Sequence, residues 1–141
     1  MRINKMIRLV VDVNVWISAL LPSNFRHRIE IFFDPEVYRF VVSKELFDEL
    51  DYAVNKPCPA KRIVRSEYEE LVAKLWSAAE HVDVHSEVNV CRDPKDNYLL
   101  ALARDGNADY LITGDSGILV LKEFGKTKIV SIKDFEVIAR Q

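Results

Sequence analysis

Disulfide frameworks, zinc clusters and fibrous repeats need residues that this 141-residue sequence contains in small numbers. It has two cysteines, four glycines and five prolines, and it shows no internal repeat or low-complexity stretch. Cys58 and Cys91 lack CxxC spacing, and two thiols cannot by themselves build a disulfide framework or a zinc site. Hydrophobic residues make up 49% of the chain and charged residues 30%, as in folded globular proteins. We therefore expect a single domain that covers residues 1–141.

Long hydrophobic runs are also missing. No stretch reaches the roughly 20 consecutive apolar residues that a membrane-spanning helix needs. Basic residues precede the apolar run at 7–21, but Asp12 and Asn14 interrupt this run and no small-residue cleavage site follows it. We expect a soluble, cytoplasmic chain without a membrane segment or a signal peptide.

The sequence has no excess of positive charge. Its 22 acidic and 20 basic residues give a net charge of −2, which excludes a global field that attracts nucleic acid. Any binding of nucleic acid must therefore be local. Basic residues gather in FRHRIE and in NKPCPAKRIVR, where they fit phosphate contacts and a solvated surface equally well. The candidates for RNA contacts are Arg26, Arg28, Lys56, Lys61 and Arg62.

Strand and helix patterns alternate along the chain. Apolar and β-branched runs predict strands at 7–12, 38–42, 109–113 and 128–132, and a short strand at 81–84. Helical spacing predicts helices within 22–33 and at 44–55, 66–80, 94–105, 116–125 and 133–141. Ser43 is a predicted N-cap, and Ser66 and Glu69 have the spacing of a capping box. This alternation predicts an α/β fold with a mostly parallel sheet and helices on both faces.

Four acidic residues occupy related places in this pattern. Asp12 ends the first strand and Asp115 follows the strand at 109–113, so both lie at the carboxyl edge of a parallel sheet. Glu49 lies on the helix after the second strand, and Asp96 lies in the first turn of the helix before the strand at 109–113. We expect these four carboxylates to converge in one cleft.

Such a cluster is unfavourable alone, because neighbouring like charges raise each other's pKa. A hard divalent cation, Mg²⁺ or Mn²⁺, reverses that interaction and suits ligands that are all oxygen. A metal would also explain a carboxylate at Asp12 within an apolar run. Structural interpretations stay open for the other acids: helix capping for Asp93 and Asp96, a turn for Asp115, and simple solvent exposure for Glu49.

Four sequence blocks together resemble a known family. VVDVNVWISALL, Glu49 in SKELFDEL, CRDPKDNYLLALA and ADYLITGDSGIL are similar to the PIN-domain nucleases, especially the toxins of toxin–antitoxin pairs. The resemblance covers essentially the whole chain. It implies a three-layer α/β/α sandwich and a metal-dependent ribonuclease that cleaves RNA phosphodiester bonds, with an antitoxin partner and a homodimer.

The resemblance also implies roles for individual residues. By position, the catalytic, metal-binding acids correspond to Asp12, Glu49, Asp96 and Asp115. The supporting polar residues of the same site correspond to Asn14, Ser43, Asp93 and Thr113.

Other interpretations remain. A haloacid-dehalogenase-type phosphatase would use Asp12 as its nucleophile, but Asn14 and Leu119 stand where that mechanism needs acids. A non-catalytic module with the same fold would bind RNA or a protein without cleavage. His81 and His85 have the i, i+4 spacing of a helical zinc pair, but HVDVHSEV alternates like a strand.

Overall fold

The structure is a computed structural model that describes residues 6–21, 25–57 and 62–140, without the side chains of residues 25–27. The side chain of Arg26 therefore lies outside what is described, and so do the whole residues Cys58 and Lys61. Within these ranges, no helix is both long and apolar enough to cross a membrane.

The described residues form a six-stranded sheet with the order β3-β2-β1-β4-β6-β5. The strands are β1 (Ile7–Val11), β2 (Tyr38–Val42), β3 (Glu80–His81), β4 (Tyr110–Ile112), β5 (Glu123–Phe124) and β6 (Thr127–Val130). Neighbouring strands pair in parallel from β3 to β6, and β5 alone pairs antiparallel, with β6. The predicted mostly parallel sheet is confirmed.

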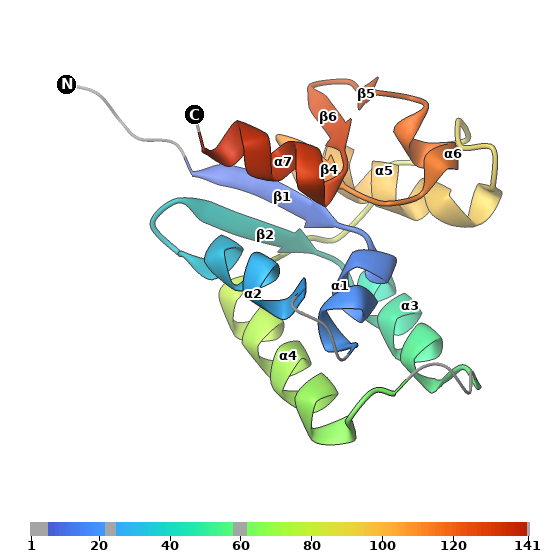
Figure 1. Ribbon diagram of the computed structural model, residues 1–141. Coiled ribbons are helices and arrows are strands. Elements are labelled where there is room, and N and C mark those ends of the chain that lie inside the picture. Colours follow the sequence, from blue (N-terminus) through green and yellow to red (C-terminus); the bar gives the residue numbers. More distant parts are fainter. Residues whose placement is uncertain (1–5, 22–24, 58–61, 141) are drawn as a thin grey trace.

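Helices cover both faces of this sheet (Figure 1). They are α1 (Val13–Leu20), α2 (Phe25–Glu30), α3 (Lys44–Asn55), α4 (Arg65–Ala78), α5 (Asn97–Asp105), α6 (Ser116–Leu119) and α7 (Ile132–Ala139), with 3₁₀ turns η1 (Ile31–Phe33) and η2 (Pro94–Asp96). In Figure 1, α7 lies in front of the sheet and α5 behind it, while α1 to α4 gather beneath β1 and β2. The three-layer α/β/α arrangement is thus confirmed.

The core explains why the strand sequences are apolar without alternation. Successive strand residues point to opposite faces. On one face, Leu9 and Tyr110 are register partners, and Phe135 of α7 packs on Tyr110 with ring centroids 4.9 Å apart. On the other face, Gly106 at the end of α5 lies so close to β2 that a Cβ there would come within 2.3 Å of Val41 Cγ1. Both faces are buried, so both need apolar side chains.

Helix α1 is the main element that the sequence patterns did not predict. It begins at Val13, directly after β1 and Asp12, and it buries Val13, Val15, Trp16, Ala19 and Leu20. Its residues continue the apolar run of the strand, which hides the change of period from two to 3.6 residues. The tight connection fixes Asp12 between a strand and a helix.

The predicted capping box is wrong. Helix α4 starts at Arg65, and Val64 occupies its N-cap position without a side-chain hydrogen bond. Ser66 therefore lies inside the helix, and Glu69 pairs with Arg65 at 3.3 Å. The apolar contacts of α4 set its position, and local capping does not.

Two other predicted elements are shorter than expected. The helix expected at 116–125 ends at Leu119, because Lys122 (φ 64°) and Gly125 (φ 59°) adopt left-handed conformations around β5. The strand expected at 81–84 is limited to the two residues of β3, and the following residues have no regular structure.

Candidate active site

The ends of β1 and β4 bring two of the predicted acids to one edge of the sheet. Val11 and Ile112 are the last register partners of these parallel strands, and the Asp12 N–H donates to the Ile112 carbonyl at 2.9 Å. Asp12 and Asp115 therefore follow neighbouring strands at the same end. This is also the point where the strand order changes direction, at which ligands bind in open α/β sheets.

Asp12 is a buried carboxylate that a hydroxyl holds in place. Its residue is 6% exposed, and the fully buried Thr113 donates its Oγ1–H to Asp12 Oδ2 at 2.7 Å. The same Thr113 oxygen accepts a hydrogen bond from Asp115 N at 3.1 Å. Burial raises the pKa of Asp12, and the Asp115 charge adds to this rise, while hydrogen bonds from Thr113 and from backbone N–H groups lower it. Although Asp12 stands at the N-cap of α1, its side chain makes no capping hydrogen bond.

Asp96 lies beside the same two carboxylates. The pKa of Asp96 is raised to about 7, first by burial and then by a side-chain hydrogen bond with Asp115 and by the charges of Asp115, Asp12 and Asp93. Asp96 makes no capping hydrogen bond to α5, whereas Asp93 Oδ1 accepts one from Lys95 N at 3.0 Å. The capping interpretation is therefore wrong for Asp96 and confirmed for Asp93.

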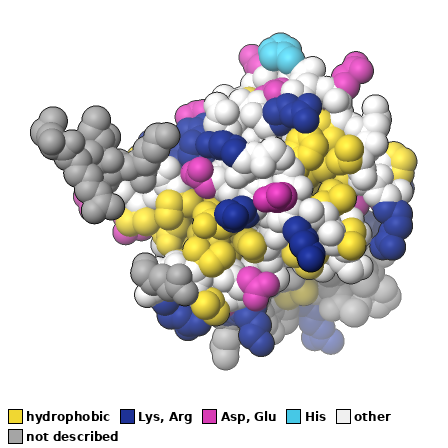
Figure 2. Space-filling model, turned by 90° about the horizontal axis from the view of Figure 1, so that it is seen from above, with side chains coloured by type: hydrophobic (Ala, Val, Ile, Leu, Met, Phe, Trp, Pro, Cys, Tyr) yellow, Lys and Arg dark blue, Asp and Glu magenta, His cyan; other side chains and the backbone are white. Residues whose placement is uncertain are grey.

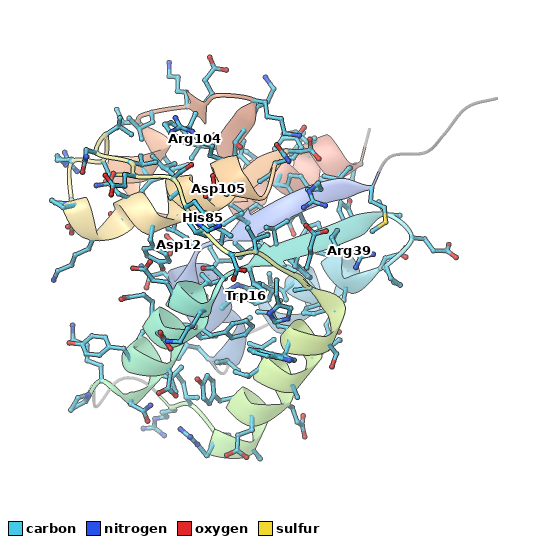
Figure 3. All side chains as sticks on the ribbon, turned by 180° about the vertical axis from the view of Figure 1, so that it is seen from behind. Asp12, Trp16, Arg39, His85, Arg104 and Asp105 are labelled. Atoms are coloured by element: carbon cyan, nitrogen blue, oxygen red, sulfur yellow. The ribbon has the colours of Figure 1, made fainter. Side chains whose placement is uncertain are left out.

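Glu49 approaches the acidic region from α3 and is exposed to solvent. It lines a cavity of about 480 Å³ together with Glu45, Ser43 and Tyr98. Figure 3 shows Asp12 near the place where α3 and α5 approach each other. Glu49 thus lies near Tyr98, whose phenol is also within the field of Asp12 and Asp96.

Tyr98 is a neighbour of the acids that sequence reasoning missed. Burial raises its pKa most, followed by the charges of Asp12, Glu49, Asp96 and Glu45. The phenol therefore lies within the field of three of the predicted acids, Asp12, Glu49 and Asp96, and of Glu45. The signal in the sequence was a tyrosine within the otherwise aliphatic run YLLALA, two residues after Asp96.

Arg92 is the second residue that sequence reasoning missed. A Cβ at Gly117 would lie 3.2 Å from Arg92 Nη2 and 3.5 Å from Asp115 Oδ1, so the guanidinium lies against the first turn of α6 near Asp115. Among the residues described, the ion pairs involve other cations. Arg92 thus brings to the edge of the acidic region a positive charge that has no ion pair among the described residues.

The predicted supporting residues have different surroundings. Thr113 contacts Asp12 directly, and Asn14 contributes a backbone hydrogen bond to it while its side chain is exposed. Ser43 is buried and its Oγ accepts a hydrogen bond from Leu46 N at 3.2 Å, so it caps α3 as predicted. Its part in the site, like that of Asp93, stays a prediction.

The candidate basic residues do not form one surface in the described part of the chain. Arg28 Nε donates to Glu136 Oε2 at 2.9 Å, which ties α2 to α7. Lys56 and Arg62 are exposed near the end of α3 and before α4. On the face seen in Figure 2, basic and acidic side chains are interspersed with hydrophobic ones. His81 and His85 do not share a helix, and His81 Nε2 contacts the Trp76 carbonyl at 2.8 Å.

The ligand atoms of the acids suit a hard cation, but the distances between these side chains are not those of a complete metal site. Within the described ranges, no three Asp, Glu, His or Cys side chains are close enough together to form a complete metal site. Asp12, Asp96 and Asp115 offer oxygen donors only, and burial, together with the neighbouring carboxyls, raises the pKa of Asp12 and Asp96. This donor set fits Mg²⁺ or Mn²⁺. A bound cation would relieve the repulsion that the protein otherwise relieves by protonation.

Comparisons with solved structures show the same fold in three proteins of low sequence identity. VapBC2 from Rickettsia felis, bound to a DNA fragment from its promoter, is 15% identical with a TM-score of 0.55 and covers 87% of this chain and 97% of its own. PAE2754 from Pyrobaculum aerophilum is 17% identical with a TM-score of 0.61, and the match covers 96% of this chain and 91% of PAE2754. FitAcB from Neisseria gonorrhoeae is 16% identical with a TM-score of 0.55 and covers 89% and 98%.

Sequence comparison gives the family. An uncharacterized protein of Methanocaldococcus jannaschii, MJ1680, is 29% identical over 126 residues, which are 85% of this chain and 78% of that protein. The family model described as PIN domain matches residues 8–117, which include all four predicted acids. The resemblance found in the sequence blocks is confirmed, and the chain belongs to the PIN domain family.

Proposed function

We propose that this chain is a metal-dependent endoribonuclease that hydrolyses RNA phosphodiester bonds, and that it is the toxin of a toxin–antitoxin pair. The observation that carries the proposal is the group of Asp12, Asp96 and Asp115 at the carboxyl edge of the sheet, where burial and then the neighbouring carboxyls raise the pKa of Asp96 to about 7. Perturbed carboxyls that come together from separate elements are typical of functional sites. Membership of the PIN domain family supports a nuclease activity.

Each residue has a distinct task in this proposal. Asp12, Asp96 and Asp115, with Glu49 from α3, would hold Mg²⁺ or Mn²⁺. The ion would activate water and stabilise the charge that develops on the cleaved phosphate. Thr113 holds Asp12 Oδ2 in one orientation. Asp96, whose pKa is about 7, would have to be deprotonated to serve as a ligand of the cation.

One alternative has an observation in its favour. A module that binds RNA or protein without cleaving it needs no closed metal site, and the described residues contain none. The intact set of four acids favours the enzyme. A phosphatase of the haloacid-dehalogenase type is weaker, because Asn14 stands where its proton-transferring acid is needed.

The proposal includes partners. The fold similarity to VapBC2 and FitAcB supports a protein antitoxin as partner. We also propose a homodimer, on the resemblance of the sequence to PIN-domain toxins. The site of action would be the cytoplasm, where RNA substrates occur. Size-exclusion chromatography with light scattering tests the dimer, and co-expression with the product of an adjacent small reading frame tests the antitoxin.

The decisive experiment is RNA cleavage in a metal series. Purified protein is incubated with single-stranded RNA and with Mg²⁺, Mn²⁺, Ca²⁺ or EDTA, beside Asp12→Asn and a matched control, Asp134→Asn. Asp134 is an exposed carboxylate on α7. We expect cleavage with Mg²⁺ or Mn²⁺ in the wild type and the control, and none in Asp12→Asn. Cleavage that persists in EDTA, or in Asp12→Asn, contradicts the proposal.

A further inference from the structure

Next to Asp115 lies a cavity of about 350 Å³ that the sequence analysis did not predict. Three segments line it: the start of α1 after β1, the turn after β4, and the start of α7 after β6. The cavity therefore opens at the carboxyl ends of three neighbouring parallel strands, β1, β4 and β6. Its volume is near the lower end of the roughly 300–1,000 Å³ of small-ligand sites, which suits one nucleoside and excludes an oligonucleotide.

We propose that this cavity binds one nucleoside of the RNA, the nucleoside that adjoins the cleaved phosphate. The inference rests on the proposed ribonuclease function and adds to it a subsite that selects the substrate. Asp115 belongs both to the acidic group and to the cavity wall, so a nucleotide whose base and sugar fill the cavity places its phosphate beside the acids.

The lining has the chemistry of a nucleoside site. Val15 and Ile132 supply apolar walls for the faces of a base. Ser18 Oγ donates to the Asn14 carbonyl at 3.0 Å and keeps its lone pairs for an outside donor. Ser131 Oγ accepts from Asp134 N at 3.1 Å and keeps its hydrogen to donate. The exposed Asn14 amide adds one further donor and acceptor group.

Charge separates this cavity from the others at the same edge. The cavity of about 480 Å³ beside Tyr98 is lined by four acidic residues, Glu45, Asp48, Glu49 and Asp83, and by one cation, Lys44, so its excess of negative charge repels a phosphate chain. The cavity of about 350 Å³ has a single charged residue in its wall, Asp115. RNA therefore meets less repulsion when its base enters between α1 and α7.

Gly114 lines the cavity and is exposed to solvent. A Cβ placed on Gly114 would meet no heavy atom within 4 Å, and the φ angle there does not lie in the left-handed region. The backbone thus tolerates a side chain at this position, where it would stand in open space at the wall of the cavity. Gly114→Val is a steric block that costs the fold little.

The first test measures binding without metal or cleavage. Adenosine, guanosine, cytidine and uridine are titrated into the full chain, and amide chemical shifts are followed by NMR. Uncharged nucleosides avoid repulsion from the acids. We expect at least one nucleoside to shift the amides of Gly114 and Ile132 with a dissociation constant of roughly millimolar order. Absence of any shift at about 20 mM of every nucleoside overturns the inference.

The second test uses the steric block. Gly114→Val is expected to weaken nucleoside binding at least about tenfold and to raise KM for RNA, with Gly114→Ala intermediate. The control is Ser116→Val, which adds a similar side chain to an exposed residue on the other side of Asp115. Gly114→Val protein that binds nucleosides as the wild type does overturns the inference. Wild-type protein that binds nucleosides but cleaves no RNA with Mg²⁺ or Mn²⁺ contradicts the ribonuclease function and leaves the nucleoside site standing.

Discussion

The two ends of the sheet use charged residues in opposite ways. At the amino ends, Arg8 of β1 donates to Glu80 Oε1 at 3.1 Å and to the Gly106 carbonyl at 2.8 Å. Asp109 accepts a hydrogen bond from Arg8 N at 2.8 Å and pairs with Lys126 at 3.4 Å. Each charge there has a partner of opposite sign, and the partners join α5 with β1, β3 and β4.

At the carboxyl ends, Asp12, Asp96 and Asp115 have one another as neighbours. The ion pairs found among the described residues involve other carboxylates. Charge repulsion and burial therefore raise the pKa of Asp12 and Asp96. The comparison teaches that one edge stabilises the fold, while the other keeps unfavourable charge that a ligand can relieve.

Removal of one charge from the carboxyl edge should have the largest effect. Asp12→Asn should lower kcat/KM for RNA about 100-fold or more, because the site loses a buried charge that the cation needs. The same change should raise the Tm of the metal-free protein, since it removes repulsion and the desolvation of a charge. Cleavage kinetics and calorimetry measure the two effects. A lower Tm together with lost activity would indicate general damage to the fold.

Removal of the positive charge of Arg8 at the amino edge should lower the stability and leave the activity unchanged. Arg8→Met should lower the free energy of unfolding by about 2 kcal/mol, because Glu80 and the Gly106 carbonyl lose their donor. Cleavage by the folded fraction should not change. The control is Lys44→Met, which breaks an exposed i, i+4 pair with Asp48 and should lower the stability much less. Equal costs in urea unfolding would contradict the contrast between the edges.

Thr113→Val should affect both the stability and the activity, each less than the Arg8→Met and Asp12→Asn variants do. The variant keeps the shape of the side chain but removes the hydroxyl that binds Asp12 Oδ2 and Asp115 N. We expect about a tenfold loss of kcat/KM and weaker binding of Mn²⁺, as for residues that orient metal ligands. Thr113→Ser should restore both. If Thr113→Ser behaves like Thr113→Val, the hydroxyl is not the cause.

The smallest expected effect is a dependence of stability on pH. The pKa of Asp96 rises from an ordinary value near 3.8 to about 7 in the folded chain. The folded protein then binds more protons than the unfolded one between these values, so its stability falls as pH rises through them. Because Asp96 is partly exposed, we expect about 1 kcal/mol between pH 5 and pH 8. Thermal unfolding without metal measures it.

Two additions sharpen this pH prediction. Asp96→Asn should flatten the decrease between pH 5 and pH 8, and Mg²⁺ or Mn²⁺ should restore the Tm of the wild type at pH 8 by mass action. An equal Tm gain from the ion in Asp12→Asn would place the cation elsewhere.

The sequence was sufficient for the strands β1, β2, β4 and β6 and for two of the acids. Apolar runs locate β1 and β4, and parallel pairing then places Asp12 and Asp115 at one edge without further information. Helix α1 escaped prediction, because its buried residues extend the apolar run of β1. Local patterns describe each segment alone and do not show where an unbroken apolar run changes conformation.

The rest of the site depends on packing between segments far apart in the chain. The rotation of α3 and α5 against each other decides that Glu49 faces Tyr98. The path of the irregular residues after β3 decides that Arg92 reaches Gly117. The cavity at Gly114 exists because three strand ends lie in a row, which only the strand order determines.

The contacts at Gly106 fix the end of α5 at the amino edge of the sheet, so the length of this helix determines where Asp96 lies at the carboxyl edge. Val41 and the Arg8 guanidinium fix its last turn, so it cannot slide along the sheet. Insertion of one residue within α5 would turn Asp96 about 100° around the helix axis and away from Asp12. The β5–β6 hairpin, on an outer strand, can change in length without moving a carboxylate. Length variation among relatives should therefore spare α5 and accumulate in the hairpin.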